Sequence, residues 1–151
     1  MANTQAIATS FKTEILKGIH ALGTSVVRAG TGADTIKAAL FLASASLGAA
    51  TTTYSVTGEV SGTNYTAGGV TVTNANAPSN SGTTAFWTPS ASLSWTTVTL
   101  STAFDAVEFY NSSQGDKTIG IYTFGSQTIT AGNFSLSMPT NDSSTGLLRI
   151  S

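Results

Sequence analysis

The stretch AVEFYNSSQGDKTIGIYTF (Ala106–Phe124) is the part of the chain most informative about the fold, because it places two strand patterns around one tight turn. In its second half, Ile119, Ile121 and Thr123 alternate with other residues and so share one face of a predicted strand. Between the two patterns, NSSQGD (Asn111–Asp116) supplies Asn and Gly, which tolerate the positive φ angles of hairpin turns. The stretch therefore predicts an antiparallel β-hairpin with one polar face.

Strand patterns of the same kind fill most of the chain after residue 34. They are short, rich in Val, Ile, Thr, Phe and Tyr, and bounded by turn residues. The predicted strands are Thr35–Leu42, Val70–Thr73, Thr83–Trp87, Ser94–Leu100, Ala106–Tyr110, Thr118–Phe124, Gln127–Thr130, Asn133–Met138 and Gly146–Ile150. This order of many short strands predicts a mainly β fold, with an antiparallel β-sandwich or jelly-roll-like body.

Three connections between these strands have distinct compositions. Ala131–Asn133 combines Ala, Gly and Asn and predicts a second turn. Ala75–Thr83 contains only small polar residues, Ala, Gly and Pro, and predicts a surface loop. Tyr54–Gly69 mixes Gly with Tyr54, Glu59 and Tyr65, and we expect an ordered connection there without regular secondary structure.

The first twenty residues carry the period of a helix instead. Ile7, Phe11, Ile15 and Ile19 recur every four residues and predict the apolar face of one amphipathic helix, Thr4–Leu22. Asn3 or Thr4 can cap its start, and Gly18 or Gly23 can end it. Two partners are open for this face: the sheet of its own domain, or a neighbouring subunit that these four residues would contact as an interface.

A glycine-rich stretch separates the helix from the strands. AGTGAD (Ala29–Asp34) predicts a link, so the chain divides into an N-terminal helix or arm (1–28), the link (29–34) and a β domain (35–151).

Charge is scarce throughout the chain. Only 9% of residues are charged, against about 25% in ordinary soluble domains, while Thr and Ser number 27 and 20. Ala38–Asp116 contains no lysine or arginine. A surface covered by hydroxyl groups lacks long-range electrostatic steering, which suits a chain packed into an assembly better than an enzyme with a charged substrate. Without a basic patch, a nucleic-acid partner is not expected.

Few residues could support catalysis or bind a metal. Cysteine is absent, and His20 is the only histidine. His20 has no nucleophile motif nearby, and at the end of the predicted helix an imidazolium would suit the negative end of the helix dipole. Asp105 and Glu108, three residues apart on a strand, would face opposite sides. We therefore predict no catalytic residue, no cofactor and no metal site.

The aromatic residues allow two interpretations. Trp87 and Trp95, with Phe86, Tyr110 and Tyr122, would be core residues in most β folds, but an exposed row of this kind could bind a glycan. No membrane partner is expected, because the most apolar stretch, Ala38–Ala50, is too short to span a bilayer. The N-terminus lacks the pattern of a secretory signal, so synthesis in the cytosol is expected.

Several stretches resemble a family of small virion structural proteins of tailed bacteriophages. They are TSFKTEILKGIH (Thr9–His20), TIKAALFL (Thr35–Leu42), YSVTGEVSGTNYTAGGVTV (Tyr54–Val72), AVEFYNSSQGDKTIGIYTFG (Ala106–Gly125), and Phe134–Ile150 with its Met138-Pro139 pair and final LLRI. The resemblance spans nearly the whole chain. It implies a non-enzymatic capsid decoration or cement protein on the surface of the virion. Such a protein would bind the major capsid protein or another virion protein, as a dimer or trimer.

Two other functions stay open at this point. A tail or fibre-attachment protein of the virion would have the same composition, and only its place in the particle would distinguish it. A glycan- or receptor-binding β module would need exposed indole rings at Trp87 and Trp95. For a helix that docks on the shell, Ile7→Asp or Phe11→Asp is expected to abolish particle binding and leave the β body folded.

Overall fold

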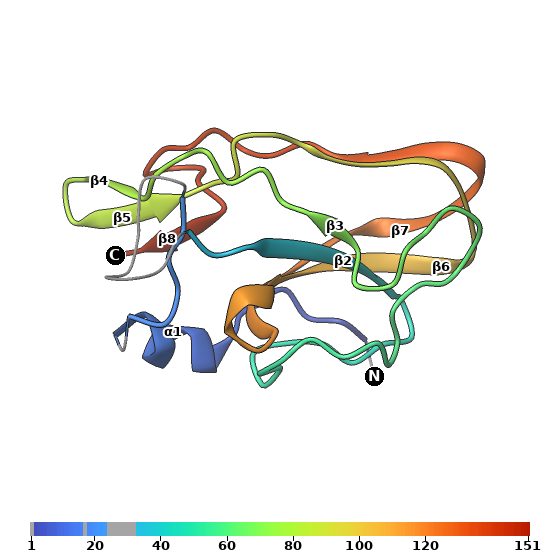
Figure 1. Cartoon of the computed structure of the whole chain (residues 1–151), viewed down its shortest axis with the longest axis horizontal. Helices are drawn as coiled ribbons and strands as arrows, with labels where there is room; N and C mark the ends of the chain where they lie inside the picture. Colours follow the sequence, from blue (N-terminus) through green and yellow to red (C-terminus); the bar gives the residue numbers. More distant parts are fainter. Residues whose placement is uncertain (1, 17, 24–32) are drawn as a thin grey trace.

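The chain is mainly β, with two antiparallel sheets, in a computed structural model that describes residues 2–16, 18–23 and 33–151 (Figure 1). The five-stranded sheet has the order β1-β7-β6-β2-β3, and the three-stranded sheet has the order β4-β5-β8. The strands are β1 (Ala6–Ile7), β2 (Ile36–Leu42), β3 (Val70–Thr71), β4 (Ser79–Ser81), β5 (Thr84–Trp87), β6 (Leu93–Asn111), β7 (Lys117–Leu136) and β8 (Leu148–Ile150). One α-helix, α1 (Thr9–Leu16), and one 3₁₀ turn, η1 (Ser112–Gln114), complete the described elements. The predicted mainly β fold is confirmed.

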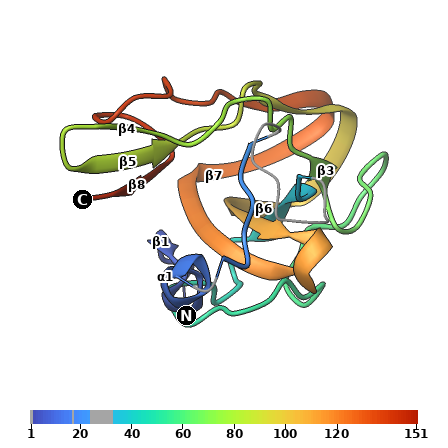
Figure 2. The same cartoon turned by 60° about the vertical axis from the view of Figure 1, so that its left-hand side comes forward.

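The predicted hairpin dominates the molecule. β6 and β7 are 19 and 20 residues long and are joined by η1, where Gly115 and Asp116 both adopt positive φ. Both strands turn at one end of the molecule and run back over the sheet (Figure 1), and the strong curvature of β7 is plain in Figure 2. The small sheet β4-β5-β8 lies at the opposite end.

The sequence predicted five strands where the structure has two. Ser94–Leu100 and Ala106–Tyr110 both belong to β6, and the predicted breaks are shifts of pairing register within continuous strands. The predicted turn at Ala131–Asn133 is wrong, because these residues lie inside β7. Ala131 has φ 46° and its N–H donates to Thr99 Oγ1 at 3.0 Å. The residues that suggested turns supply the irregular backbone that bends the hairpin.

Apolar side chains fill both faces of the hairpin. Val107 and Phe109 belong to the larger core, while Ala106 and Tyr110 belong to a smaller core on the other face, because successive side chains in a strand point to opposite sides. The larger core also receives Phe11, Leu40 and Phe134, along with many other residues.

The N-terminal helix is much shorter than predicted. Instead of starting the helix, Ala6 and Ile7 form β1 and pair with Ile121 and Gly120 of β7. Asn3 does not cap the helix: its amide donates to Leu42 O and Asp105 Oδ1 and accepts from Leu47 N–H. The open edge of β7 takes up the backbone groups of residues 6 and 7, which a helix would otherwise have to satisfy.

The helix ends where one of the two proposed glycines stands. Gly18 has φ 66°, its N–H donates to Ile15 O at 2.9 Å, and Ile19 N–H donates to Glu14 O at 3.0 Å. These two bonds form the Schellman motif that glycine permits. No helix of the described chain is long and apolar enough to cross a membrane.

The remaining connections differ from the prediction in one place. The predicted loop Ala75–Thr83 contains β4, which pairs with β5 through Ser79, Asn80 and Ser81. Polar side chains gave no strand signal there, because both faces of β4 are exposed. Tyr54–Gly69 contains no strand longer than an isolated bridge, as expected. Of the predicted link Ala29–Asp34, residues 29–32 lie outside the described residues.

Candidate functional site

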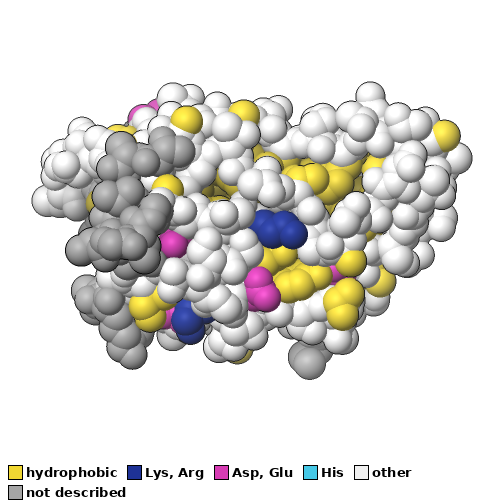
Figure 3. All heavy atoms as spheres, in the orientation of Figure 1, with side chains coloured by type: hydrophobic (Ala, Val, Ile, Leu, Met, Phe, Trp, Pro, Cys, Tyr) yellow, Lys and Arg dark blue, Asp and Glu magenta, His cyan; other side chains and the backbone are white. Residues whose placement is uncertain are grey.

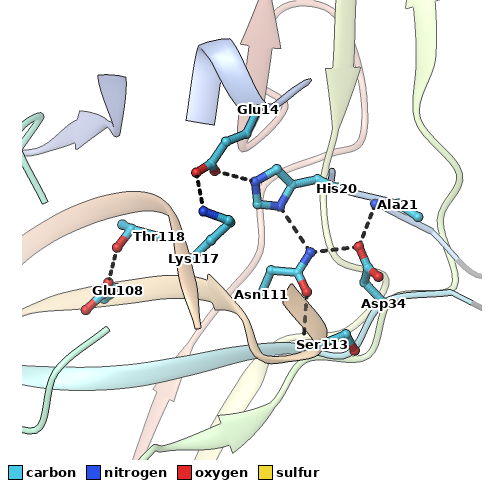
Figure 4. Close-up of polar contacts among 9 residues, drawn as sticks. All are labelled: Glu14, His20, Ala21, Asp34, Glu108, Asn111, Ser113, Lys117 and Thr118. Atoms are coloured by element: carbon cyan, nitrogen blue, oxygen red, sulfur yellow. Dashed lines mark hydrogen bonds and ion pairs between the residues drawn. The ribbon is translucent and has the colours of Figure 1, made fainter. Parts of the chain in front are cut away.

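Polar side chains from three separate segments converge next to the turn of the hairpin (Figure 4). We call the set Glu14, His20, Asp34, Asn111 and Lys117 the hairpin-turn network. Glu14 comes from α1, and Asn111 and Lys117 come from the facing ends of β6 and β7. The network therefore connects the N-terminal segment to the element that organises the sheet.

Asn111 is fully buried and fixes the proton positions of this network. Its Oδ1 accepts from Ser113 N–H at 3.2 Å, so its Nδ2 faces Asp34 Oδ2 at 2.7 Å and His20 Nδ1 at 3.0 Å. Since Nδ2 can only donate, His20 Nδ1 must accept, and the proton of the ring lies on Nε2. His20 Nε2 then donates to Glu14 Oε2 at 2.8 Å. This geometry assigns His20 a neutral ring, in place of the imidazolium expected at the end of the helix.

Glu14 is a buried carboxylate with two donors. In addition to His20, Lys117 Nζ lies 3.0 Å from Glu14 Oε1. Burial raises the pKa of Glu14, but the hydrogen bonds from His20 and Lys117 outweigh that effect and hold the pKa below its usual value. Glu14 therefore stays ionised at neutral pH, and its side chain anchors α1 to β7.

Glu14→Gln is expected to reduce stability at neutral pH and to flatten its acid dependence. A carboxylate whose pKa is lowered by folding stabilises the fold at any pH above its pKa in the unfolded chain. That contribution is lost as the pH falls through its pKa in the folded protein. The variant lacks this group, so it should lose about 1–2 kcal/mol at pH 7. Urea unfolding of both proteins from pH 3 to pH 7 measures the difference. Equal slopes for the two proteins below pH 4.5 would contradict the assignment.

The side chain of His20 is fully buried, so it cannot contact a substrate in this conformation. Asp34 Oδ2 accepts from Ala21 N–H at 2.7 Å as well as from Asn111. The network thus holds residues 20–22 against the hairpin, and we assign it a structural role. Within the described ranges, no three His, Asp or Glu side chains are placed to hold a metal ion together.

A second cluster orders the connection Tyr54–Gly69. Glu59 accepts from Tyr54 Oη at 2.5 Å, from Tyr65 Oη at 2.7 Å and from Gly68 N–H at 2.8 Å. The ring of Tyr54 stacks on that of Tyr110 at 4.4 Å. Burial, with Asp116 and Glu59 nearby, raises the pKa of Tyr110 to about 12. This connection is therefore ordered by the residues that the sequence singled out there.

The predicted interface residues lie against the protein's own body. Phe11 is buried in the larger core, and Ile7 and Ile15 are half-buried against it. Ile19 is also half-buried. Phe11→Asp is consequently expected to unfold the domain, so it cannot separate particle binding from folding. Contact of these residues with a second subunit stays a prediction.

The predicted aromatic row does not form an exposed platform. Trp87 and Trp95 are 2% and 4% exposed and belong to the larger core. Tyr110 is buried, and Phe86 and Tyr122 are half-buried. The core interpretation of these residues is the one that the structure supports.

Most acidic side chains lie inside the protein. Glu14, Asp34, Glu59 and Glu108 are all buried. Among the described charged side chains, only Asp116 and Arg149 are exposed. Four others are half-buried: Lys37, Asp105, Lys117 and Asp142. The face in Figure 3 accordingly shows isolated charged spots on an uncharged surface. Composition alone could not reveal this, because acidic residues are normally exposed.

Large apolar side chains are also rare on the described surface. Val56 is 63% exposed and Ile150 is 49% exposed. Ile150 borders a hollow of about 210 Å³ that Phe11, Ile15, Trp87 and Leu148 also line. On the visible face, the backbone and side chains that are neither hydrophobic nor charged make up most of the described surface (Figure 3).

Comparison with known proteins adds no relative: no protein-family model matches the chain, and no match is found among curated proteins or solved structures.

Proposed function

We propose that this chain is a structural component of a phage particle, a capsid decoration or cement protein that binds the major capsid protein and reinforces its lattice. The observation that carries the proposal is the nearly uncharged described surface, on which Asp116 and Arg149 are the exposed charges. The resemblance of the sequence to small virion structural proteins gives the proposal its location.

Such a surface favours one kind of binding. Where the described surface has so few exposed charges, the contact must rest on shape, hydrogen bonds and apolar burial, at about 25 cal/mol per Å² before the costs of association. A single contact of this kind is modest, but an icosahedral shell repeats it many times. The hydroxyl-rich exterior also lets two copies approach without like-charge repulsion, which suits a homo-oligomer.

The proposed body is a β-sandwich. The returning halves of β6 and β7 would form one layer over β2 and the other halves of the hairpin, with Trp95, Phe104 and Phe134 among the residues between them. In this arrangement the N-terminal segment is docked on the same body, and we propose a dimer or trimer as the unit that binds the shell.

Binding to the shell is expected to be nearly independent of salt. Ion pairs at a surface weaken as the Debye length falls from about 10 Å at 0.1 M to about 3 Å at 1 M, whereas the described part of this surface has few charges to screen. Co-sedimentation with undecorated shells should give a Kd that changes less than about threefold between 50 mM and 500 mM NaCl. Weakening by tenfold or more would contradict the proposed mode of binding.

A cryo-EM reconstruction of the particle tests the location. Density for this chain on the outer capsid lattice is the expected result. Density at the tail or portal only would instead support a tail or fibre-attachment protein, and absence from the particle would overturn both. The glycan-binding alternative required exposed indole rings, and those of Trp87 and Trp95 are in the core.

A further inference from the structure

Glu108 is a carboxyl group in an unusual place. It lies on β6 in the face that contains the smaller core, and its side chain is fully buried. Oε1 accepts from Thr118 Oγ1 at 2.6 Å, while Oε2 has no hydrogen-bond partner (Figure 4). A buried carboxylate with an unpaired oxygen costs far more than a protonated carboxyl in the same place.

The groups around Glu108 do not compensate a negative charge. Glu59 from the connection and Asp116 from the hairpin turn both act on it as like charges. The neighbouring strands place Ala39 and Ile121 beside it. On its own strand, Tyr110 follows on the same face. Lys117 pairs with Glu14 instead. Lys37 of β2 shares the face of Glu108, but it lies opposite Tyr110 and its Nζ is directed to Gly68, beside Tyr110 Oη.

A surface segment is attached directly beside this carboxyl. Tyr54 N–H donates to Asp116 O at 2.8 Å, and Thr118 N–H donates to Thr52 O at 3.0 Å. Thr118 therefore links Glu108 to residues 51–60: its hydroxyl donates to Glu108, and its backbone amide donates to Thr52 O. We call residues 51–60 the covering segment. It also carries Val56, the more exposed of the two large apolar residues on the described surface.

We propose that Glu108 is a pH-sensitive latch, which keeps the covering segment closed over β6 when it is protonated and loosens that segment when it ionises. The ionised carboxylate needs water at Oε2, and the covering segment has to move for water to enter. The proton goes to solvent, so no other reactant is needed. This inference is independent of the proposed place in a virion.

The direction with pH follows from the burial of the group. Burial, with smaller contributions from Glu59 and Asp116 and against the bond from Thr118, raises the pKa of Glu108 to about 7 from a usual value of 4.5. The closed form binds this proton more tightly than the open form does. The equilibrium constant for opening therefore increases as the pH rises from 4.5 to about 7, by up to about tenfold per pH unit, and levels off at higher pH.

Hydrogen exchange measured by mass spectrometry between pH 5 and pH 8 tests the latch on the full chain. After correction for the intrinsic exchange rate, protection of the amides of Tyr54 and Thr118 should fall roughly 10- to 100-fold over this range. Peptides around the paired residues Trp95 of β6 and Phe134 of β7, which lie away from the covering segment, serve as the internal reference and should change little. In Glu108→Gln, which cannot ionise, the protection should be independent of pH.

Asp105→Asn is the matched control, because it removes a carboxylate from the same strand at a half-buried site. It should keep the pH dependence of the wild type. Constant protection from pH 5 to pH 8 in the wild type, or an unchanged slope in Glu108→Gln, would overturn the latch. Should Glu108→Gln fail to fold, carbon NMR of the Glu108 carboxyl in the wild type decides: a midpoint near 7 supports the latch, and one below 5.5 refutes it.

Discussion

Asn111→Asp is expected to destabilise the protein by about 3–5 kcal/mol at pH 7. The substitution keeps the shape and the oxygen that accepts from Ser113 N–H, so the cap of η1 is preserved. It replaces the donor that lies 2.7 Å from Asp34 Oδ2 with an acceptor, which places two carboxylates together in a buried site. His20 Nδ1 loses its donor in the same step.

Urea unfolding followed by circular dichroism measures this loss, and a fall in melting temperature of about 10 °C or more should accompany it. Asn80→Asp is the matched control, because it introduces the same charge on exposed β4 and should change stability by less than about 0.5 kcal/mol. If Asn111→Asp were as stable as the control, the orientation given to the Asn111 amide would be wrong, and with it the neutral ring of His20.

The elements that the sequence predicted well are those with local causes. The alternation in Thr118–Phe124 and the Gly and Asn of NSSQGD determine a hairpin whatever surrounds them, and the structure has it at that place. Gly18 likewise ends α1 by its own backbone preference. Local pattern fails where a distant partner decides, as at Ala6–Ile7, where the edge of β7 makes a strand of residues in a helical pattern.

The breaks in the long strands show a second limit. Gly, Ala and Asn at residues 131–133 have the same local preference for positive φ whether the chain reverses or only bulges. What distinguishes the two is pairing with β6 on both sides of the irregularity, as between Leu100 and Ile129 and between Trp95 and Phe134. Sequence windows of a few residues do not contain that information.

The sequence indicated some of the buried polar residues but not their partners. His20, Glu59, Tyr54 and Tyr65 attract attention as single residues, but one partner of His20, Asn111, lies 91 positions away. Asn111 looked like an ordinary turn residue. The burial of Glu108 was not predictable either, because the two-residue period gives its face but not whether another segment covers that face. In this protein the smaller core and residues 51–60 cover it.

Glu59→Ala is expected to destabilise the fold by about 3–5 kcal/mol, because it removes one acceptor from three donors at once. Tyr54 Oη, Tyr65 Oη and the Gly68 N–H all donate to this carboxylate, which is itself buried. Gly68 is itself buried and has φ 87°, so its amide cannot turn to another acceptor without moving the backbone around it. Loss of order between residues 54 and 69 should appear as a weaker near-ultraviolet circular dichroism signal from tyrosine.

Tyr54→Phe and Tyr65→Phe divide this effect into its parts. Each keeps the ring and removes one donor to Glu59, which should cost about 0.5–1.5 kcal/mol in urea unfolding. Tyr65→Phe also removes the acceptor of Leu40 N–H, which lies 3.0 Å from Tyr65 Oη, so it should cost more than Tyr54→Phe. If Glu59→Ala cost no more than either, the carboxylate would not be the organising group, and the stacked rings of Tyr54 and Tyr110 would have to hold the connection. Glu59→Ala also removes a like charge that acts on Glu108. In the variant, the carboxyl of Glu108 should therefore titrate at a lower pH than in the wild type, which couples the order of this connection to the charge beneath it.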